Sequence, residues 1–138
     1  MRQKNLGGLP VFGRNARYFD WTVLEPAFET TEVNGWLVLR VHGELDMATA
    51  PRLRQQVVAA ANLGVAQLVL DLDDVDFLDS TALGVIVGAV KRMRTREGEL
   101  RVVCTRKNLI ELFEITRLSN VFELFKTVAD ATAMGKAT

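Results

Sequence analysis

The segment Asp79-Ser80-Thr81 places a carboxylate and two hydroxyl groups side by side, directly after the apolar residues Phe77 and Leu78. An apolar run that ends in Asp, Ser and Thr is typical of a strand followed by the first turn of a helix. The unpaired N–H groups and the positive dipole end of that turn favour a phosphate group. Ser80 is therefore a candidate phosphorylation site, with Thr81 as the second hydroxyl. Taken alone, the segment also fits a simpler role in which Ser80 only caps the helix.

The residues near Ser80 lack the partners that a catalytic serine needs. A nucleophilic serine requires a base, and the one histidine of the chain, His42, is expected to be a structural residue beside a turn. Leu78 and Ala82 stand where a nucleophile elbow has glycines, and the chain has no glycine-rich phosphate loop followed by Lys-Ser or Lys-Thr. We therefore predict that the protein is not an enzyme.

Metal binding finds little support in the residue types. Asp46, Asp76 and Asp79 could form an acidic cluster for a divalent cation, but carboxylates on loops more often cap helices or face solvent. The chain has one histidine and one cysteine, too few for the usual histidine or cysteine sites. We predict neither a metal nor a cofactor, and we expect Cys104, which alternates with Leu100, to be a buried thiol.

The elements around these residues alternate between strand-like and helix-like patterns. Asn34-Gly35 between two strand-like runs, 28–33 and 36–41, predicts a β-hairpin, followed by a turn at 42–46. Periodicity then predicts a helix between 49 and 64, a strand at 67–72, a helix from Ser80 to about 96, a strand at 100–104, a helix at 107–115, a strand at 121–125 and a last helix at 128–134. This order predicts an α/β fold with one mixed sheet of about five strands and helices packed on it.

Four small residues in the helix after Ser80 invite an explanation, because glycine inside a helix costs about 1 kcal/mol relative to alanine. They are Ala82, Gly84, Gly88 and Ala89. Close packing of this helix on its own sheet would explain them, and so would close approach of a partner. The sequence leaves both explanations open.

Length and charge limit the organisation and the partners. The 138 residues fit one domain, which we place at 25–138, after an extension over 1–24 that is expected to be flexible. Four aromatic residues in that extension suggest that it docks on the domain or on a partner. Equal numbers of acidic and basic residues, 17 each, predict no direct binding to nucleic acid or to a membrane, and the basic run at 91–96 is read as solvated. We expect a cytoplasmic protein, since the start of the chain lacks the apolar core of a signal peptide.

Two segments together resemble the signature regions of the STAS domain of bacterial anti-sigma factor antagonists. They are Gly43-Glu44-Leu45-Asp46 leading to Ala50-Pro51-Arg52-Leu53, and 75–84. The segments 113–118 and 121–125 also look like the end of that family's domain, so the resemblance covers roughly 28–128. The chain departs from the family at Ala82, where the family often has glycine.

This resemblance implies a regulator that works by partner switching. Unphosphorylated, such an antagonist binds an anti-sigma factor that is also a serine kinase, and so releases a sigma factor. Phosphorylation of the serine that matches Ser80 breaks the complex, and a serine phosphatase restores it. The resemblance further implies that partner-binding residues are Asp46, Asp79, Ser80, Thr81, Leu83 and Gly84.

Other functions remain open at this point. The domain could be a STAS-like scaffold or accessory subunit of a transport or signalling complex, with Ser80 only as a cap. An anion or nucleotide could bind at the helix terminus that holds Ser80. A homodimer is a further possibility.

Overall fold

A β-hairpin begins the part of the chain that the computed structural model describes, residues 27–133. Its strands are β1 (Ala27–Val33) and β2 (Trp36–Leu45), paired antiparallel. The turn between them uses the left-handed backbone conformation at Asn34, φ 52°, and Gly35, φ 86°, as the Asn-Gly pair predicts. The expected extension over 1–24, and the boundary at residue 25, lie outside the described residues.

The rest of the sheet is parallel. Strands β3 (Gln67–Leu78), β4 (Glu99–Val103) and β5 (Glu123–Phe125) follow β2 in the order β1-β2-β3-β4-β5, and each is parallel to its predecessor from β2 onward. Helices α1 (Ala50–Asn62), α2 (Ser80–Thr95) and α3 (Lys107–Ile115) lie between successive strands, and α4 (Val128–Ala131) follows β5. The prediction of one mixed five-stranded sheet with packed helices is confirmed.

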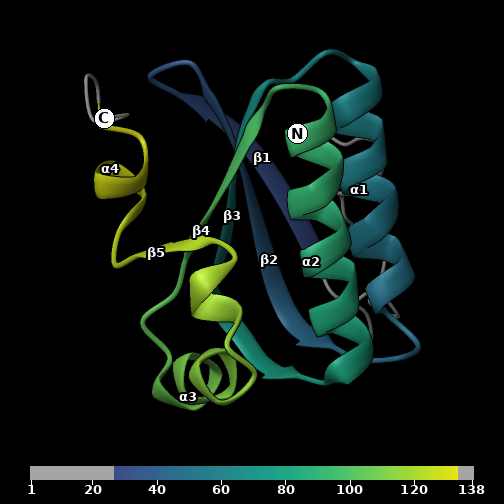
Figure 1. Ribbon diagram of the computed structural model, residues 1–138, viewed down its shortest axis with the longest axis vertical. Coiled ribbons are helices and arrows are strands. Elements are labelled where there is room, and N and C mark those ends of the chain that lie inside the picture. Colours follow the sequence, from purple (N-terminus) through teal and green to yellow (C-terminus); the bar gives the residue numbers. More distant parts are fainter. Residues whose placement is uncertain (1–26, 134–138) are drawn as a thin grey trace, which may run out of the picture.

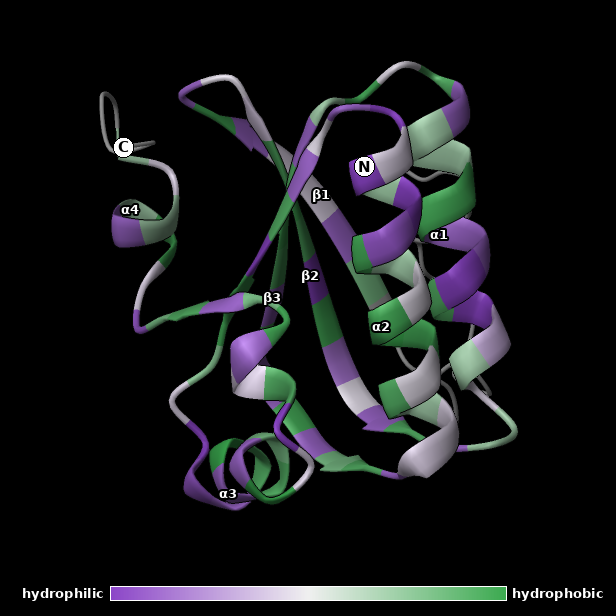
Figure 2. Cartoon of the chain, in the orientation of Figure 1, coloured by the Kyte–Doolittle hydropathy of each residue, from purple (hydrophilic) through white to green (hydrophobic). Residues whose placement is uncertain are grey.

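Helices α1 and α2 lie side by side on one face of the sheet (Figure 1). Hydrophobic and hydrophilic residues are interspersed along both helices (Figure 2), and the buried residues recur at helical spacing, so each helix packs one apolar side on the sheet. The large residues buried in this main core include Leu39, Leu53, Leu70, Ile86 and Met93. The inner residues of β3, from Leu68 to Leu72, are all buried, as is typical of a parallel strand that is covered on both faces.

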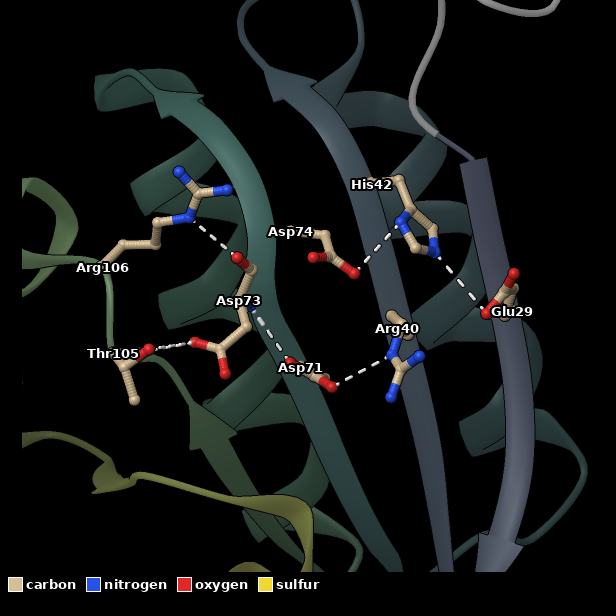
Figure 3. A network of polar contacts seen from close by, with 8 residues as sticks. All are labelled: Glu29, Arg40, His42, Asp71, Asp73, Asp74, Thr105 and Arg106. Carbon is tan, nitrogen blue, oxygen red and sulfur yellow. Dashed lines mark hydrogen bonds and ion pairs between the residues drawn. The ribbon is translucent and has the colours of Figure 1, made fainter.

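The opposite face of the sheet is covered only in part. Ala131 of α4 packs there with Trp36, Val38 and Val69 in a second, smaller core. The guanidinium of Arg101 lies 4.4 Å from the centroid of the Trp36 ring, and its Nη1 donates a hydrogen bond to the carbonyl oxygen of Ala131 at 2.9 Å. The remainder of this face carries polar and charged side chains (Figure 3).

Strands β2 and β3 are longer than predicted. β2 continues to Leu45 through the segment expected to turn at 42–46. β3 is one strand from Gln67 to Leu78, which joins the strand predicted at 67–72 to the strand-like residues Phe77 and Leu78 before the helix. The pairing of these strands contains register shifts between Arg40 and His42 and between Gly43 and Glu44. Such irregularities break the alternation of apolar residues while the ladder continues, so the periodicity ended before the strands did.

Three differences lie toward the end of the described chain. Leu118–Asn120 form a 3-10 helix that the sequence did not predict, and β5 begins at Glu123 rather than at residue 121. Phe122 packs edge-to-face on Phe113, with ring centroids 5.3 Å apart, so its burial comes from α3 and not from strand pairing. Helix α4 ends at Ala131, whereas the predicted helix extends to residue 134, which lies outside the described residues.

Candidate functional site

The carboxyl ends of β2 and β3 bring the two predicted aspartates to one edge of the sheet. The last residues of the strands, Leu45 and Leu78, are paired, and Asp46 and Asp79 follow them directly. The backbone N–H of Asp79 donates to the carbonyl oxygen of Leu45 at 3.1 Å. Parallel strands therefore place both connections to the helices beside each other.

Asp46 organises the entry to α1. Its Oδ1 accepts hydrogen bonds from the backbone N–H groups of Ala48 at 3.0 Å and of Thr49 at 3.1 Å. Thr49 occupies the N-cap position and Pro51 lies in the first turn, but the Thr49 hydroxyl contacts Glu44 and Asp46 rather than an N–H group of α1. The carboxylate of Asp46 thus holds the loop that precedes α1.

Asp79, and not Ser80, caps α2. Its backbone is extended, with φ −104° and ψ −176°, and its Oδ1 accepts a hydrogen bond from the N–H of Ala82 at 3.0 Å. Its Oδ2 accepts a second one, from the N–H of Met47 at 2.9 Å. The expectation that Ser80 caps the helix is therefore wrong, because the aspartate before it already occupies that position and satisfies the third N–H of the helix.

Ser80 and Thr81 are the first two residues of α2, and both side chains are exposed. Within residues 27–133 the Ser80 hydroxyl has no hydrogen-bond partner. Of the first four N–H groups of α2, that of Ala82 donates to Asp79 Oδ1 and that of Leu83 donates to the Asp79 carbonyl oxygen. The other two, of Ser80 and Thr81, have no partner within residues 27–133. An accessible hydroxyl thus lies at the positive end of the helix dipole.

Leu83 and Gly84 differ in their surroundings. Leu83 is 8% exposed and belongs to the main core, so its position supports a structural role more than contact with a partner. Gly84 is exposed, and a Cβ built on it would have no heavy atom within 4 Å; the same is true of Gly88.

These burials resolve the question of the small residues in α2. Ala82 and Ala89 are buried against the molecule's own core, so packing on the sheet explains them. The two glycines face open space, and contact with their own sheet does not explain them.

A groove of about 340 Å³ runs between α1 and α2 from Thr81. Gly84 and Gly88 line one side, Val57 and Val58 of α1 line the other, and the side chains of Arg54 and Arg92 also border it. Among residues 27–133, no acidic residue lines this groove. Helix periodicity does not show which helices lie next to each other, so the groove could not be predicted from the sequence.

Two large apolar side chains near this edge are also exposed. Met47, whose N–H bonds to Asp79, is 73% exposed, and Phe77 is 48% exposed. Neither residue was predicted from the sequence to be functional. Met47 could have been noticed in the sequence because it is a large apolar residue in the loop between Asp46 and Thr49, where polar residues are usual.

His42 and Asp76, which were considered for catalysis and for metal binding, lie beside charged side chains. His42 lies within β2 rather than beside a turn, and its Nδ1 is 3.3 Å from Asp74 Oδ2 while its Nε2 is 3.5 Å from Glu29 Oε1 (Figure 3). Asp76 is paired with Arg106 at 3.3 Å. In residues 27–133 no group of three His, Cys, Asp or Glu side chains is placed so that it could hold a metal ion, and this includes Asp46, Asp76 and Asp79.

The remaining expectations concern burial. Cys104 is 2% exposed, and burial raises the pKa of its thiol, which confirms a core cysteine. In the basic run at 91–96, Lys91, Arg94 and Arg96 are exposed and only Met93 is buried, as a solvated face requires. Among the described helices, none has the length and apolar character needed to cross a membrane.

Comparisons with known proteins agree with this geometry. Residues 27–131 match the family model described as the STAS domain. The chain is 38% identical over 86 residues to the anti-sigma-B factor antagonist of Bacillus subtilis, covering 62% of this chain and 78% of that protein. It is 42% identical over 85 residues to the protein of the same name from Listeria monocytogenes, covering 61% and 74%. The crystal structure of an anti-sigma factor antagonist from Mycobacterium paratuberculosis superposes with a TM-score of 0.72 at 29% identity, covering 78% of this chain and 91% of that one.

Proposed function

Because this chain belongs to the STAS domain family of anti-sigma factor antagonists, we propose that it binds an anti-sigma factor through the edge that carries Ser80 and so releases a sigma factor. The anti-sigma factor in this proposal is also a serine kinase that phosphorylates Ser80, and a serine phosphatase reverses the modification. The domain itself binds and is modified, without catalysis of its own. Since sigma factors act on RNA polymerase, this function belongs in the cytoplasm.

The observation that carries the proposal is the division of roles between Asp79 and Ser80. Asp79 caps α2 through Ala82, whereas the Ser80 hydroxyl is exposed and bonded to nothing in the described residues. A kinase can therefore reach the hydroxyl, and the helix keeps its cap when the hydroxyl is modified. Phosphorylation then changes the surface without unfolding the helix.

The added charge explains why such a change prevents binding. A phosphoserine carries about −1.5 to −2 charges at neutral pH. At Ser80 this charge would stand next to the carboxylate of Asp79, which is held in place by Ala82 and Met47. A partner surface that fits the uncharged edge would then meet concentrated negative charge and a bulkier group. Like-charge contacts of this kind cost several kcal/mol in an interface.

The surface proposed for the partner extends from the edge into the groove between α1 and α2. Asp46 and Asp79 shape its two loops, and Ser80 and Thr81 lie at its centre. Gly84 continues it along α2, where the lack of a side chain lets a partner approach the helix backbone. Leu83 supports the same turn from within the core.

The test is phosphorylation and binding with the kinase-type anti-sigma factor from the same organism. With ATP, intact mass should rise by one phosphate on the unmodified chain and not on Ser80→Ala. Thr81→Ala is the matched control and should still gain the phosphate. A phosphate that persists on Ser80→Ala and disappears on Thr81→Ala would move the site to Thr81.

Binding measured by calorimetry separates the switch from the alternative of a scaffold subunit. Ser80→Ala should bind the anti-sigma factor as the unmodified chain does, and Ser80→Asp should bind at least tenfold more weakly, a difference of about 1.4 kcal/mol. Equal affinity of both variants, with no phosphate transferred, would contradict the phospho-switch and favour a scaffold.

A further inference from the structure

The face of the sheet opposite α1 and α2 carries an acidic surface that the proposed partner site does not use (Figure 3). We call this surface the acidic face. It comprises Glu29 of β1 and Asp71, Asp73 and Asp74 of β3, together with Asp76, which is linked to them through Arg106, whose Nε donates to the Asp73 carbonyl oxygen. Its cations are Arg40, paired with Asp71 at 3.2 Å, and Arg106, paired with Asp76 at 3.3 Å. Five carboxylates against two guanidinium groups leave an excess of negative charge.

Much of the acidic face is open to solvent. The side chains of Glu29, Asp74 and Asp76 are 63%, 50% and 65% exposed. Helix α4 covers the other end of this face, around Trp36 and Val69, and does not extend the second core to these carboxylates. The acidic face is therefore an unpartnered part of the sheet in the described residues.

The start of the chain has the opposite charge. Residues 1–19 contain Arg2, Lys4, Arg14 and Arg17 and no acidic residue. Because the whole chain has 17 basic and 17 acidic residues, residues 20–138 hold 13 basic and 17 acidic ones. The net charge of zero is therefore the sum of a basic segment, 1–19, and an acidic remainder, 20–138. Opposite charges favour contact between the two parts.

This basic segment joins the domain beside the acidic face. Strand β1 begins at Ala27, which is paired with His42, and the His42 ring lies between Glu29 and Asp74. Arg17 precedes Ala27 by ten residues, so an extended chain could place it up to about 33 Å away. Strand β3 is only about 10 Å from β1 across the sheet. The segment can therefore reach every carboxylate of the acidic face.

We propose that residues 1–19 dock across the acidic face of their own domain, with Arg14 and Arg17 against its carboxylates. Phe77, exposed next to Asp76, provides apolar surface for the nonpolar residues of the same segment. The docked segment and a partner bound to α1 and α2 would occupy opposite faces of the sheet. This docking requires no phosphorylation, so it can fail or hold independently of the function proposed above.

Paramagnetic broadening in NMR spectra of the full chain tests the proposal. A spin label is attached to Ala16→Cys; the buried Cys104 thiol, with its raised pKa, reacts far more slowly than an exposed cysteine. We expect peak-intensity loss at the amides of Asp73, Asp74 and Asp76, and little loss at Gln55 and Asn62 of α1. The loss should fall in about 1 M sodium chloride, where the screening length is about 3 Å.

Charge reversal separates specific docking from a general effect of charge. Arg14→Glu with Arg17→Glu should abolish the broadening of the acidic face. Lys91→Glu with Lys126→Glu makes the same change in net charge at two exposed lysines on α2 and after β5, and should preserve it. Equal broadening of both faces, broadening centred on α1 and α2, or survival of the effect in the Arg14 and Arg17 variant would overturn the proposal.

A mixed sample identifies the occupant. Isotope-labelled chains without a spin label are combined with unlabelled, spin-labelled chains, so that broadening can arise only between molecules. Docking within one chain predicts no loss at the acidic face in this sample. Broadening there would show that a second copy supplies the segment, and would overturn intramolecular docking.

Discussion

The carboxylate of Asp79 accepts a hydrogen bond from the backbone N–H of Met47 at 2.9 Å and thereby joins the two loops at the edge of the sheet. The same carboxylate caps α2 through Ala82. One side chain therefore fixes both the helix that begins with Ser80 and the neighbouring loop that follows Asp46. The position of the proposed phosphorylation site depends on this bridge more than on Ser80 itself.

Asp79→Ala should destabilise the domain, whereas Ser80→Ala should not. Loss of an N-cap costs about 1 kcal/mol, and loss of the bond from Met47 adds to it. Ser80 is exposed and caps nothing, so its truncation should change the free energy of unfolding by less than about 0.5 kcal/mol. Urea unfolding of the two variants measures the difference. An equal loss of stability in both would contradict the assignment of Asp79 as the cap.

Gly84→Ala and Gly88→Ala should each stabilise the free domain. Both glycines are in α2 with open space at the Cβ position, and alanine is favoured over glycine in a helix by up to about 1 kcal/mol. The same variants should weaken binding to the anti-sigma factor, because the new methyl groups narrow the groove. Thermal unfolding and calorimetry test the two effects separately.

Gly98→Ala serves as the matched control for these substitutions. A Cβ at this position would lie 2.7 Å from the backbone oxygen of Ala66, so this variant should lose stability. Stabilised Gly84 and Gly88 variants that bind with unchanged affinity would remove the groove from the proposed interface while leaving the helix argument intact.

The Cys104 thiol should be nearly inert in the folded protein and should make stability depend on alkaline pH. Burial raises its pKa, so the unfolded thiol ionises first as the pH rises. The unfolded state then gains stability, and the free energy of unfolding should decline above the ordinary thiol pKa of about 8.5. Urea unfolding across this pH range, with Cys104→Ala as the reference that lacks this decline, measures the effect. Rapid reaction of the native thiol with a disulfide reagent would contradict its burial.

Arg101→Met should loosen α4 from the sheet. The Arg101 guanidinium lies over the Trp36 ring and donates to the carbonyl oxygen of Ala131 at 2.9 Å, and its side chain is 4% exposed. Methionine preserves much of the apolar contact but leaves that carbonyl without its donor, which costs about 1–3 kcal/mol. Hydrogen exchange should accelerate at Ala131 and Thr132 more than in α1. Uniform acceleration over the whole domain would argue against a local role.

Much of the fold was predictable because local patterns and tertiary packing agree. The Asn34-Gly35 turn, the inward residues of β3 and α3 at 107–115 all appear where the residue types require them. The far ends of β2 and β3 were not predictable from periodicity, because the register shifts near His42 and Gly43 break the alternation of apolar residues. The helix cap was assigned to Ser80 although Asp79 takes it, since both residue types suit that position equally well.

The sequence by itself determined the alternation of strands and helices, the burial of Cys104 and the presence of a hydroxyl pair after an acidic residue at a strand-to-helix junction. These features depend on residues that are near one another in the chain, so they can be predicted from hydrophobic periodicity and residue spacing. Only the tertiary structure decided that Asp79 bridges to Met47, that Gly84 and Gly88 face a groove rather than the core, and that the carboxylates of β1 and β3 share one face. Each of these relationships joins segments that are distant along the chain, and it exists because parallel strand pairing brings their ends together.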